Sequence, residues 1–306
     1  MDLSKIKGSI WFDGEVIDWQ EANVHLLTHT LHYGLGVFEG VRAYKTPIGS
    51  SIFRLDDHTD RLFNSAKTVN MQIPFSKIDL NKAHKTVVIL NDLSEAYIRP
   101  MCFYGSEGMG LRADNLKVHC MVAAWEWPSY MEPEAREKGI KVKLSSYTRQ
   151  VRNPVSSAKV NGNYVHSIVA LNEALAEGFD EALMLDAEGN VAEGSGENIF
   201  IVKNNVLITP DLDASLDGIT RRTILDLAKE LNIKYEIKKL KYEDILDADE
   251  AFFSGTAAEV VPINSLDNKQ IGEGVRGPIT EQLQGAYFDQ VRGVRERNQN
   301  WHTFVE

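Results

Sequence analysis

The sequence has little that would tie it to nucleic acid, a membrane or an oxidising compartment. Its 33 Lys and Arg stand against 44 Asp and Glu, and no basic patch is present to neutralise phosphates. No apolar run approaches the length of a membrane span, and the N-terminus lacks an apolar segment followed by a small-residue cleavage site. Only two cysteines occur, Cys102 and Cys120, both in apolar strand-like runs that predict reduced core thiols. We therefore expect a soluble cytoplasmic protein.

Several common catalytic signatures are also missing from the sequence. It has no P-loop, and its eight histidines never take a metal-ligand spacing, so we expect no metal site. Residues 272–277 match the glycine spacing of a dinucleotide-binding motif, but they lie too close to the C-terminus for a following βαβ unit. The glycines of Gly194-Ser195-Gly196 flank the serine directly, which excludes a nucleophile elbow.

The length and apolar content favour two domains. A chain of 306 residues with 43% apolar content is long for one compact domain. Residues 126–136 hold two prolines and no helical or strand period, and they predict an interdomain loop. Strands are predicted in adjacent pairs, which favours α+β or barrel-like packing over a doubly wound fold. We therefore predict a small N-terminal domain at residues 1–125 and a larger, barrel-like domain at residues 137–306.

Local patterns predict the main elements. Asp13-Gly14 predicts a hairpin turn, and apolar spacing predicts a helix that Asn163 caps and that ends at Gly178. A helix over about 79–93 has Ile78, Val87, Val88 and Leu90 as its expected buried side. Other helices are expected at about 57–69, from about 220, and at about 278–294. Strands are expected at 37–44, 51–55, 96–104, 117–125, 140–146, 181–186, 198–202, 206–208, 235–240 and 251–254.

Lys159 lies among small residues between a predicted strand and a predicted helix. A lysine at such a junction is held in place and partly desolvated, and desolvation favours the neutral, nucleophilic amine that a Schiff base needs. Most lysines are solvated surface groups, so this position alone does not decide between the two roles. The role of Lys159 therefore has to be decided from other residues.

Several scattered residues fit the same chemistry. Glu193, in a glycine-rich setting, is suited to face a protonated ring nitrogen, and Arg61 and Arg99 are suited to two different anions. Gly218-Ile219-Thr220 and Gly255-Thr256-Ala257 each offer backbone N–H groups and a hydroxyl to a phosphate or carboxylate. Taken singly, each is better explained as a turn acid, an ordinary cap or a surface ion-pair partner. Together they favour pyridoxal phosphate chemistry.

Six motifs identify a family. They are His32–Gly34 with Val37–Gly40, Ala96–Pro100, Ala158-Lys159 with Gly162–Tyr164, Glu193–Asn198, Gly218–Arg221, and Ser254–Glu259. On these the sequence resembles the branched-chain amino acid aminotransferases, which have the D-amino acid aminotransferase-like fold (pyridoxal phosphate fold type IV), from about Ile10 to Val291. The resemblance implies an α+β fold of two domains with the active site at their interface. It also implies a homo-oligomer, a dimer or a hexamer, whose neighbouring subunit contributes a loop around Gly108–Leu111.

The resemblance implies roles for the matching residues. Lys159 would hold the cofactor and move the proton between the substrate Cα and the cofactor C4′, Glu193 would pair with the pyridine nitrogen, and Tyr164 would hydrogen-bond the ring oxygen O3′. The implied phosphate ligands are Arg61, the backbone N–H groups of Ile219 and Thr220, and the Thr256 hydroxyl. The implied ligands of the substrate α-carboxylate are the backbone N–H groups of Thr256 and Ala257, together with Tyr97.

The substrate pocket implied by the resemblance accepts both an apolar side chain and the distal carboxylate of glutamate. Arg99 would bind that carboxylate, and because a buried unpaired arginine is costly we expect it to keep a hydrogen-bond partner when leucine is bound. The hydroxyls of Tyr33 and Tyr130 would assist Arg99. The residues implied to form the pocket are Tyr33, Phe38, Arg42, Tyr97, Arg99, Trp127, Tyr130 and Tyr164.

These roles imply transamination of leucine, isoleucine and valine with 2-oxoglutarate, giving branched 2-oxo acids and L-glutamate. This reaction is the last step of branched-chain amino acid biosynthesis or the first step of degradation. A D-amino acid aminotransferase or an aminodeoxychorismate lyase would share the lysine, the acid and the phosphate ligands. The pocket residues distinguish this sequence from both of these enzymes. A carrier that binds the cofactor without turnover would be expected to have lost a pocket residue.

Overall fold

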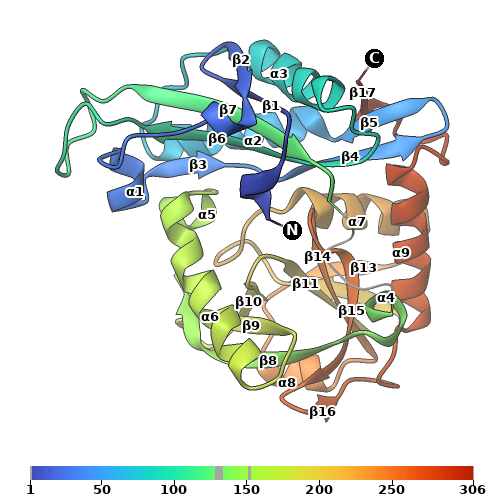
Figure 1. The fold of residues 1–306 in the computed structure, drawn as a ribbon. Helices are drawn as coiled ribbons and strands as arrows, with labels where there is room; N and C mark the ends of the chain where they lie inside the picture. The colour runs from blue at the N-terminus through green and yellow to red at the C-terminus, as the bar shows by residue number, and fades with distance from the viewer. Residues whose placement is uncertain (1, 128–133, 151–152, 306) are drawn as a thin grey trace. The chain divides into compact units, whose positions relative to one another are not determined.

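The structure, a computed structural model, describes residues 2–127, 134–150 and 153–305 (Figure 1). The chain divides into two compact units. The first comprises Met1–Pro128, Ala158–Gly162 and Gln290–Glu306, and the second comprises Ser129–Ser157 and Asn163–Asp289. The segment that carries Lys159 and the C-terminal segment thus belong to the first unit, although their position in the sequence places them within the expected range 137–306.

The first unit is built on an eight-stranded antiparallel sheet in the order β17-β5-β4-β6-β7-β1-β2, with β3 paired to β6. Its strands are β1 (Ser9–Phe12), β2 (Glu15–Asp18), β3 (Gly36–Phe38), β4 (Val41–Thr46), β5 (Gly49–Phe53), β6 (Ala96–Tyr104), β7 (Val118–Trp125) and β17 (His302–Phe304). The Asp13-Gly14 hairpin and the strand at 96–104 are confirmed. The strand expected at 37–44 is interrupted, because β3 ends at Phe38 and β4 begins at Val41.

Two helices, α2 (Leu55–Thr68) and α3 (Lys77–Leu90), pack against this sheet (Figure 1). The buried stripe of α3 is made by Leu80, Ala83, His84, Val87 and Val88, which recur at helical spacing. The prediction was correct for Val87 and Val88 and wrong for Ile78 and Leu90, which lie off that stripe and are exposed. The short helix α1 (His29–Tyr33) precedes β3.

The second unit is built on a nine-stranded mixed sheet in the order β10-β9-β8-β15-β14-β11-β12-β13, with β16 paired to β15. Its strands are β8 (Ile140–Arg149), β9 (Glu181–Asp186), β10 (Val191–Gly194), β11 (Asn198–Lys203), β12 (Val206–Thr209), β13 (Tyr235–Ile237), β14 (Glu250–Gly255), β15 (Glu259–Leu266) and β16 (Lys269–Gln270). Three residues join β10 to β11, although four other strands separate them in the sheet order. Since neighbouring strands lie about 4.8 Å apart, so short a link requires the sheet to curl on itself, as predicted by barrel-like packing.

Helix α6 (Tyr164–Ala176) packs on β8 and β9 through small side chains. Its buried residues are Ser167, Ala170 and Ala174, whereas the large apolar residues that predicted the helix, among them Ile168 and Leu175, are exposed. Gly178 follows the helix with φ of 82°, as expected for a C′ glycine. Asn163 is the N-cap residue of α6 as predicted, but its side chain makes no capping hydrogen bond, and its amide donates to the Val155 carbonyl at 2.7 Å.

The remaining helices are α4 (Ala135–Lys138), α5 (Pro154–Ser157), α7 (Ile219–Glu230), α8 (Tyr242–Leu246) and α9 (Pro278–Val291), with 3-10 turns at Leu3–Lys5, Trp19–Glu21, Asn161–Asn163 and Gln299–Trp301. Within the described ranges, no helix combines the length and the apolar character that a bilayer crossing requires. The described residues also hold no group of three His, Cys, Asp or Glu arranged to bind a metal ion. Cys102 and Cys120 are buried and free, which confirms them as core thiols.

Candidate active site

Lys159 is fixed in the first unit by its backbone. Its N–H donates to the Ser65 hydroxyl of α2 at 3.0 Å, and its carbonyl accepts from the Phe38 N–H at 3.2 Å. The next residue, Val160, forms an isolated bridge with Val37 of β3. The Lys159 Nζ lies 4.9 Å from the centre of the Phe38 ring, a cation–π distance. A short coil segment is thereby held against a strand and a helix, so the amine has a defined place.

Arg61, on α2, forms a two-point ion pair with Glu39. Its Nε and Nη2 donate to the two Glu39 oxygens at 2.7 and 2.8 Å. Nδ1 of buried His58 lies 2.8 Å from Glu39 Oε2. Burial opposes ionisation of Glu39, but Arg61 and His58 overcome it and hold the Glu39 pKa well below its ordinary value. Burial lowers the pKa of His58, so the neutral ring donates its Nδ1–H to the carboxylate.

Arg99 lies with aromatic side chains of the first unit. Its Nη2 donates to the Tyr97 hydroxyl at 3.1 Å, and its guanidinium lies 4.8 Å from the Phe38 ring centre. The Arg99 Nε is buried and has no hydrogen-bond partner within the described part of the chain. The Tyr97 ring lies 5.4 Å from the Trp127 ring. These contacts thus link five side chains in one series: Lys159, Phe38, Arg99, Tyr97 and Trp127.

Three other pocket predictions have different outcomes. The hydroxyl of half-exposed Tyr33 accepts from the Gly110 N–H at 3.2 Å, so Tyr33 contacts the loop at Gly108–Leu111, while the hydroxyl bonded to Arg99 is that of Tyr97. Arg42 is buried on β4 with its guanidinium 5.0 Å from the Tyr44 ring. Tyr130 lies outside the described residues.

In the second unit, Glu193 lies near the end of β10 as a buried carboxylate with donors on both oxygens. Oε1 is ion-paired with Arg149 of β8. Oε2 accepts from the Leu216 N–H at 3.0 Å and faces the Asn198 side-chain amide at 3.3 Å. The acid proposed for a ring nitrogen is therefore held in place by groups from three parts of the unit.

Two further acids of the second unit lie near Glu193. Glu181 of β9 and Glu197, in the turn between β10 and β11, are both buried and hydrogen-bonded to each other. Burial, and then the Glu181 charge, raise the Glu197 pKa well above its ordinary value. Burial also raises the Glu181 pKa. Each carboxylate thus lies in a setting that opposes its ionisation, Glu197 more strongly than Glu181.

The two proposed anion-binding turns also belong to the second unit. Ile219 and Thr220 open α7, and the first N–H groups of a helix have no partner within the helix. Thr256 and Ala257 form the turn between β14 and β15, where a Cβ on Gly255 would lie 3.4 Å from the Gly196 carbonyl. This turn therefore lies next to the Glu193–Asn198 motif. Half-buried Tyr164 is the first residue of α6.

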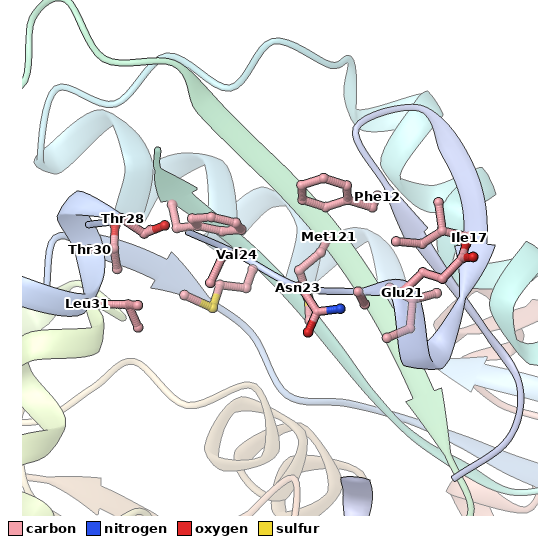
Figure 2. A pocket seen from close by; sticks show the side chains of 13 residues that line it. Phe12, Ile17, Glu21, Asn23, Val24, Thr28, Thr30, Leu31 and Met121 are labelled. Atoms are coloured by element: carbon pink, nitrogen blue, oxygen red, sulfur yellow. The ribbon is translucent and has the colours of Figure 1, made fainter. Parts of the chain in front are cut away.

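An apolar pocket of about 290 Å³ opens elsewhere in the first unit (Figure 2). Phe12, Val24, Leu31 and Met121 line it, with Thr28 and Thr30 at one side. None of the residues predicted to bind cofactor or substrate lines it. It is therefore distinct from the candidate active site.

The family sequence model described as amino-transferase class IV matches residues 36–266. The chain belongs to the class IV aminotransferases, which confirms the family resemblance. It is 57% identical over 307 residues to the branched-chain-amino-acid aminotransferase of Pseudomonas aeruginosa, with 100% of each chain covered. It is 42% identical over 295 residues to that of Escherichia coli (strain K12), covering 95% of this chain and 96% of the other.

Solved structures give the same result. The chain is similar to a branched-chain amino acid aminotransferase of T.th. with pyridoxamine 5′-phosphate, with a TM-score of 0.96, 42% identity, and 98% and 99% of the two chains covered. It is also similar to the Escherichia coli branched-chain amino acid aminotransferase, with a TM-score of 0.96, 41% identity, and 98% and 100% covered. The predicted α+β fold class is confirmed.

Sequence reasoning missed several partners of the candidate site residues, among them Glu39, His58, Arg149 and Asn198. Glu39 and Asn198 stand inside recognised motifs, so their positions carried a signal even though no chemistry was assigned to them. His58 and Arg149 lie outside the motifs, and their link to Glu39 and Glu193 exists only in the folded chain.

Proposed function

We propose that this chain is a pyridoxal 5′-phosphate-dependent transaminase that exchanges the amino group between branched-chain L-amino acids and 2-oxoglutarate. The observation that carries the proposal is the setting of Lys159, fixed by backbone bonds and placed in a row with Phe38, Arg99 and Tyr97. The relatives at 57% and 42% identity, which bear the name of this activity, support the substrate class.

The residues present fit the cofactor chemically. A lysine amine suits an aldehyde, the Glu193 carboxylate suits a protonated ring nitrogen, and Arg61 with the start of α7 suits a phosphate. Pyridoxal phosphate, when bound, supplies a carbonyl for the amino group and a ring that accepts electrons. Solved relatives with pyridoxamine 5′-phosphate and with N-(5′-phosphopyridoxyl)-L-glutamate support this choice.

Each residue then has a defined task. Lys159 holds the cofactor and moves a proton between the substrate Cα and the cofactor C4′, while Glu193 keeps the ring nitrogen protonated. Tyr164 donates to the ring oxygen O3′. The phosphate is bound by Arg61, the N–H groups of Ile219 and Thr220, and the Thr256 hydroxyl. The substrate α-carboxylate is bound by Thr256, Ala257 and Tyr97.

The pocket must hold both an apolar side chain and a carboxylate. Phe38 and Trp127 offer apolar surface, and the proposal assigns Tyr130, Tyr164 and Arg42 to the same pocket. The Arg99 Nε is a buried donor without a partner in the described residues, which suits it to the distal carboxylate of glutamate. When an apolar side chain is bound, the Tyr97 hydroxyl and the Phe38 ring continue to stabilise the Arg99 charge.

The working protein is proposed to be a homo-oligomer, a dimer or a hexamer, in the cytoplasm. Leu26 is 84% exposed and Leu111 is 90% exposed, and such apolar surface favours a subunit interface. Because Tyr33 is hydrogen-bonded to Gly110, it accompanies the loop at Gly108–Leu111 if that loop serves a neighbouring subunit. The two free buried thiols suit a reducing compartment.

Visible absorbance tests the proposed function. The purified protein with pyridoxal phosphate is expected to show a yellow band that L-leucine bleaches and 2-oxoglutarate restores. Bleaching by D-alanine in place of L-leucine would assign the chain to D-amino acid transamination. A band that no amino acid bleaches would indicate a carrier, and the absence of any band would refute the cofactor.

A further inference from the structure

We propose that Asn198 is a positioning residue that ties Glu193, at the ring-nitrogen site, to the segment that starts helix α7, at the phosphate site. Gly218 lacks a side chain because Asn198 occupies that space. The inference rests on the proposed function, which assigns Glu193 to the cofactor ring and the N–H groups of Ile219 and Thr220 to its phosphate.

The chemistry of the Asn198 side chain is set by its two neighbours. Its Nδ2 lies 3.3 Å from Glu193 Oε2 and 2.9 Å from the Leu216 carbonyl oxygen. Both neighbours are acceptors, so this end of the amide must be the NH₂ group, with one hydrogen for each. The Leu216 N–H donates to the same Glu193 oxygen at 3.0 Å. Glu193, Asn198 and Leu216 therefore form a closed hydrogen-bonded ring.

This ring reaches the phosphate site through the chain itself. Leu216 is two residues before Gly218, the N-cap of α7, and three before Ile219. Asn198 begins β11, which pairs with β12 and β14, so the amide is anchored in the sheet. A displacement of Leu216 would move both a donor to Glu193 and the N–H groups that open α7. The two ends of the proposed cofactor site are thus mechanically linked.

Gly218 gives an independent observation of the same arrangement. A Cβ on Gly218 would lie 3.2 Å from Asn198 Cγ and closer still to Asn198 Oδ1, far inside van der Waals contact. The backbone at Gly218 has φ of −69° and ψ of 132°, which any residue adopts without strain. Space for Asn198 is therefore the reason that the position requires glycine. Because Asn198 is buried, an alanine at position 218 must push its amide away from Glu193 and Leu216.

Binding of fragments to the cofactor-free protein tests this link without any turnover. Pyridoxal reports on the ring end, inorganic phosphate reports on the phosphate end, and pyridoxal phosphate reports on both. Asn198→Ala is expected to raise the Kd of pyridoxal and that of phosphate, each about tenfold. Asn198→Asp, of equal size, sets a carboxylate against two acceptors and is expected to weaken pyridoxal further than Asn198→Ala does.

Gly218→Ala supplies the decisive comparison. Alone it is expected to weaken both fragments as Asn198→Ala does, because it displaces the same amide. The double variant is expected to bind no more weakly than Asn198→Ala, since the clashing amide is gone and the new methyl group has room. If Gly218→Ala fails to fold, the double variant is expected to fold and to match Asn198→Ala.

Asn190→Ala is the matched control. Asn190 is also a buried amide of the second unit, and its Nδ2 donates to the Asp186 carboxylate at 2.9 Å. Its removal is expected to leave the three affinities within about twofold of the wild type. A wild-type protein that does not bind pyridoxal phosphate would refute the proposed function. If the wild type does bind pyridoxal phosphate, two results would refute the role of Asn198 and leave the proposed function standing. One is that Asn198→Ala weakens the binding of pyridoxal only. The other is that the effects of Asn198→Ala and Gly218→Ala multiply in the double variant.

Discussion

Acid conditions are expected to destabilise the first unit through His84. This residue lies on the buried stripe of α3, and burial lowers its pKa to about 4, although its contact with the Leu80 carbonyl acts in the opposite direction. The His84 Nδ1 lies 2.7 Å from that carbonyl, so the neutral ring donates there, while Nε2 has no partner among the described residues. A proton added at Nε2 would therefore place a charge in a buried site where no described group accepts it.

The magnitude follows from proton linkage. In the unfolded chain a histidine has a pKa of about 6.5, so between about pH 6.5 and 4 the unfolded state binds more protons than the folded state. Stability due to His84 is therefore fully present above about pH 6.5 and is lost as the pH falls. By about pH 4.5 the loss amounts to about 2.5 kcal/mol. That is a large share of a typical free energy of unfolding of about 5–15 kcal/mol. The lowered pKa of His58 acts in the same direction.

Urea unfolding at a series of pH values measures this loss. His84→Asn keeps a donor near the Nδ1 position and removes the titration, so its free energy of unfolding is expected to fall about 2.5 kcal/mol less than that of the wild type between about pH 7 and 4.5. The shape of the pH profile is the readout, because the smaller side chain also lowers stability at every pH. His166→Asn, at an exposed position of α6, is the control. Parallel profiles for wild type and His84→Asn would refute the reasoning.

Three further predictions concern the candidate active site. Lys159→Ala is expected to abolish transamination while thermal unfolding changes little; turnover within an order of magnitude of the wild type would contradict the role of Lys159. Glu197→Gln mimics the protonated acid. Because the Glu197 pKa is raised in the folded state, the free energy of unfolding of the wild type falls as the pH rises above about 4.5. The free energy of unfolding of Glu197→Gln is therefore expected to rise relative to that of the wild type by up to about 1.4 kcal/mol per pH unit. A constant difference in stability across pH would count against the raised Glu197 pKa. A Cβ on Gly40 would lie 2.9 Å from Tyr97 Cζ and closer to its hydroxyl. Gly40→Ala and Tyr97→Phe are therefore each expected to lower kcat/KM for L-glutamate about tenfold or more. Wild-type kinetics in Gly40→Ala would show that the hydroxyl position is unimportant, and Gly285→Ala, at an exposed helical glycine with free space, is the control.

The fold was predictable where periodicity and turn chemistry agree. The Asp13-Gly14 hairpin and the strands at 96–104 and 181–186 follow from alternation and turn residues, and they match the structure. Burial was harder to predict, because it depends on what covers each face. The large apolar residues of α6, among them Ile168 and Leu175, are exposed, while Ala170 and Ala174 pack on the sheet. Small side chains allow the helix and the strands to approach closely.

From the sequence we could select the candidate site residues that carry reactive groups, but not the residues that hold those groups in place. Lys159, Glu193 and Arg61 were selected for their chemistry. Their partners belong to other elements of the fold, as Arg149 of β8 does for Glu193, and no sequence spacing brings such pairs together. The pairing of Arg99 with Tyr97 is different: the two residues alternate along β6, so a strand places them on the same face.

Two glycines in the recognised motifs are explained by side chains that lie far away in the sequence. Gly40 leaves room for the Tyr97 hydroxyl, which accepts from Arg99, and Gly218 leaves room for the Asn198 amide, which faces Glu193. Neither glycine carries a reactive group, yet a methyl group at either position would displace a side chain that orients a proposed ligand of substrate or cofactor. A glycine without left-handed φ can therefore mark the place of another residue's side chain, and at these two positions that side chain belongs to the candidate active site.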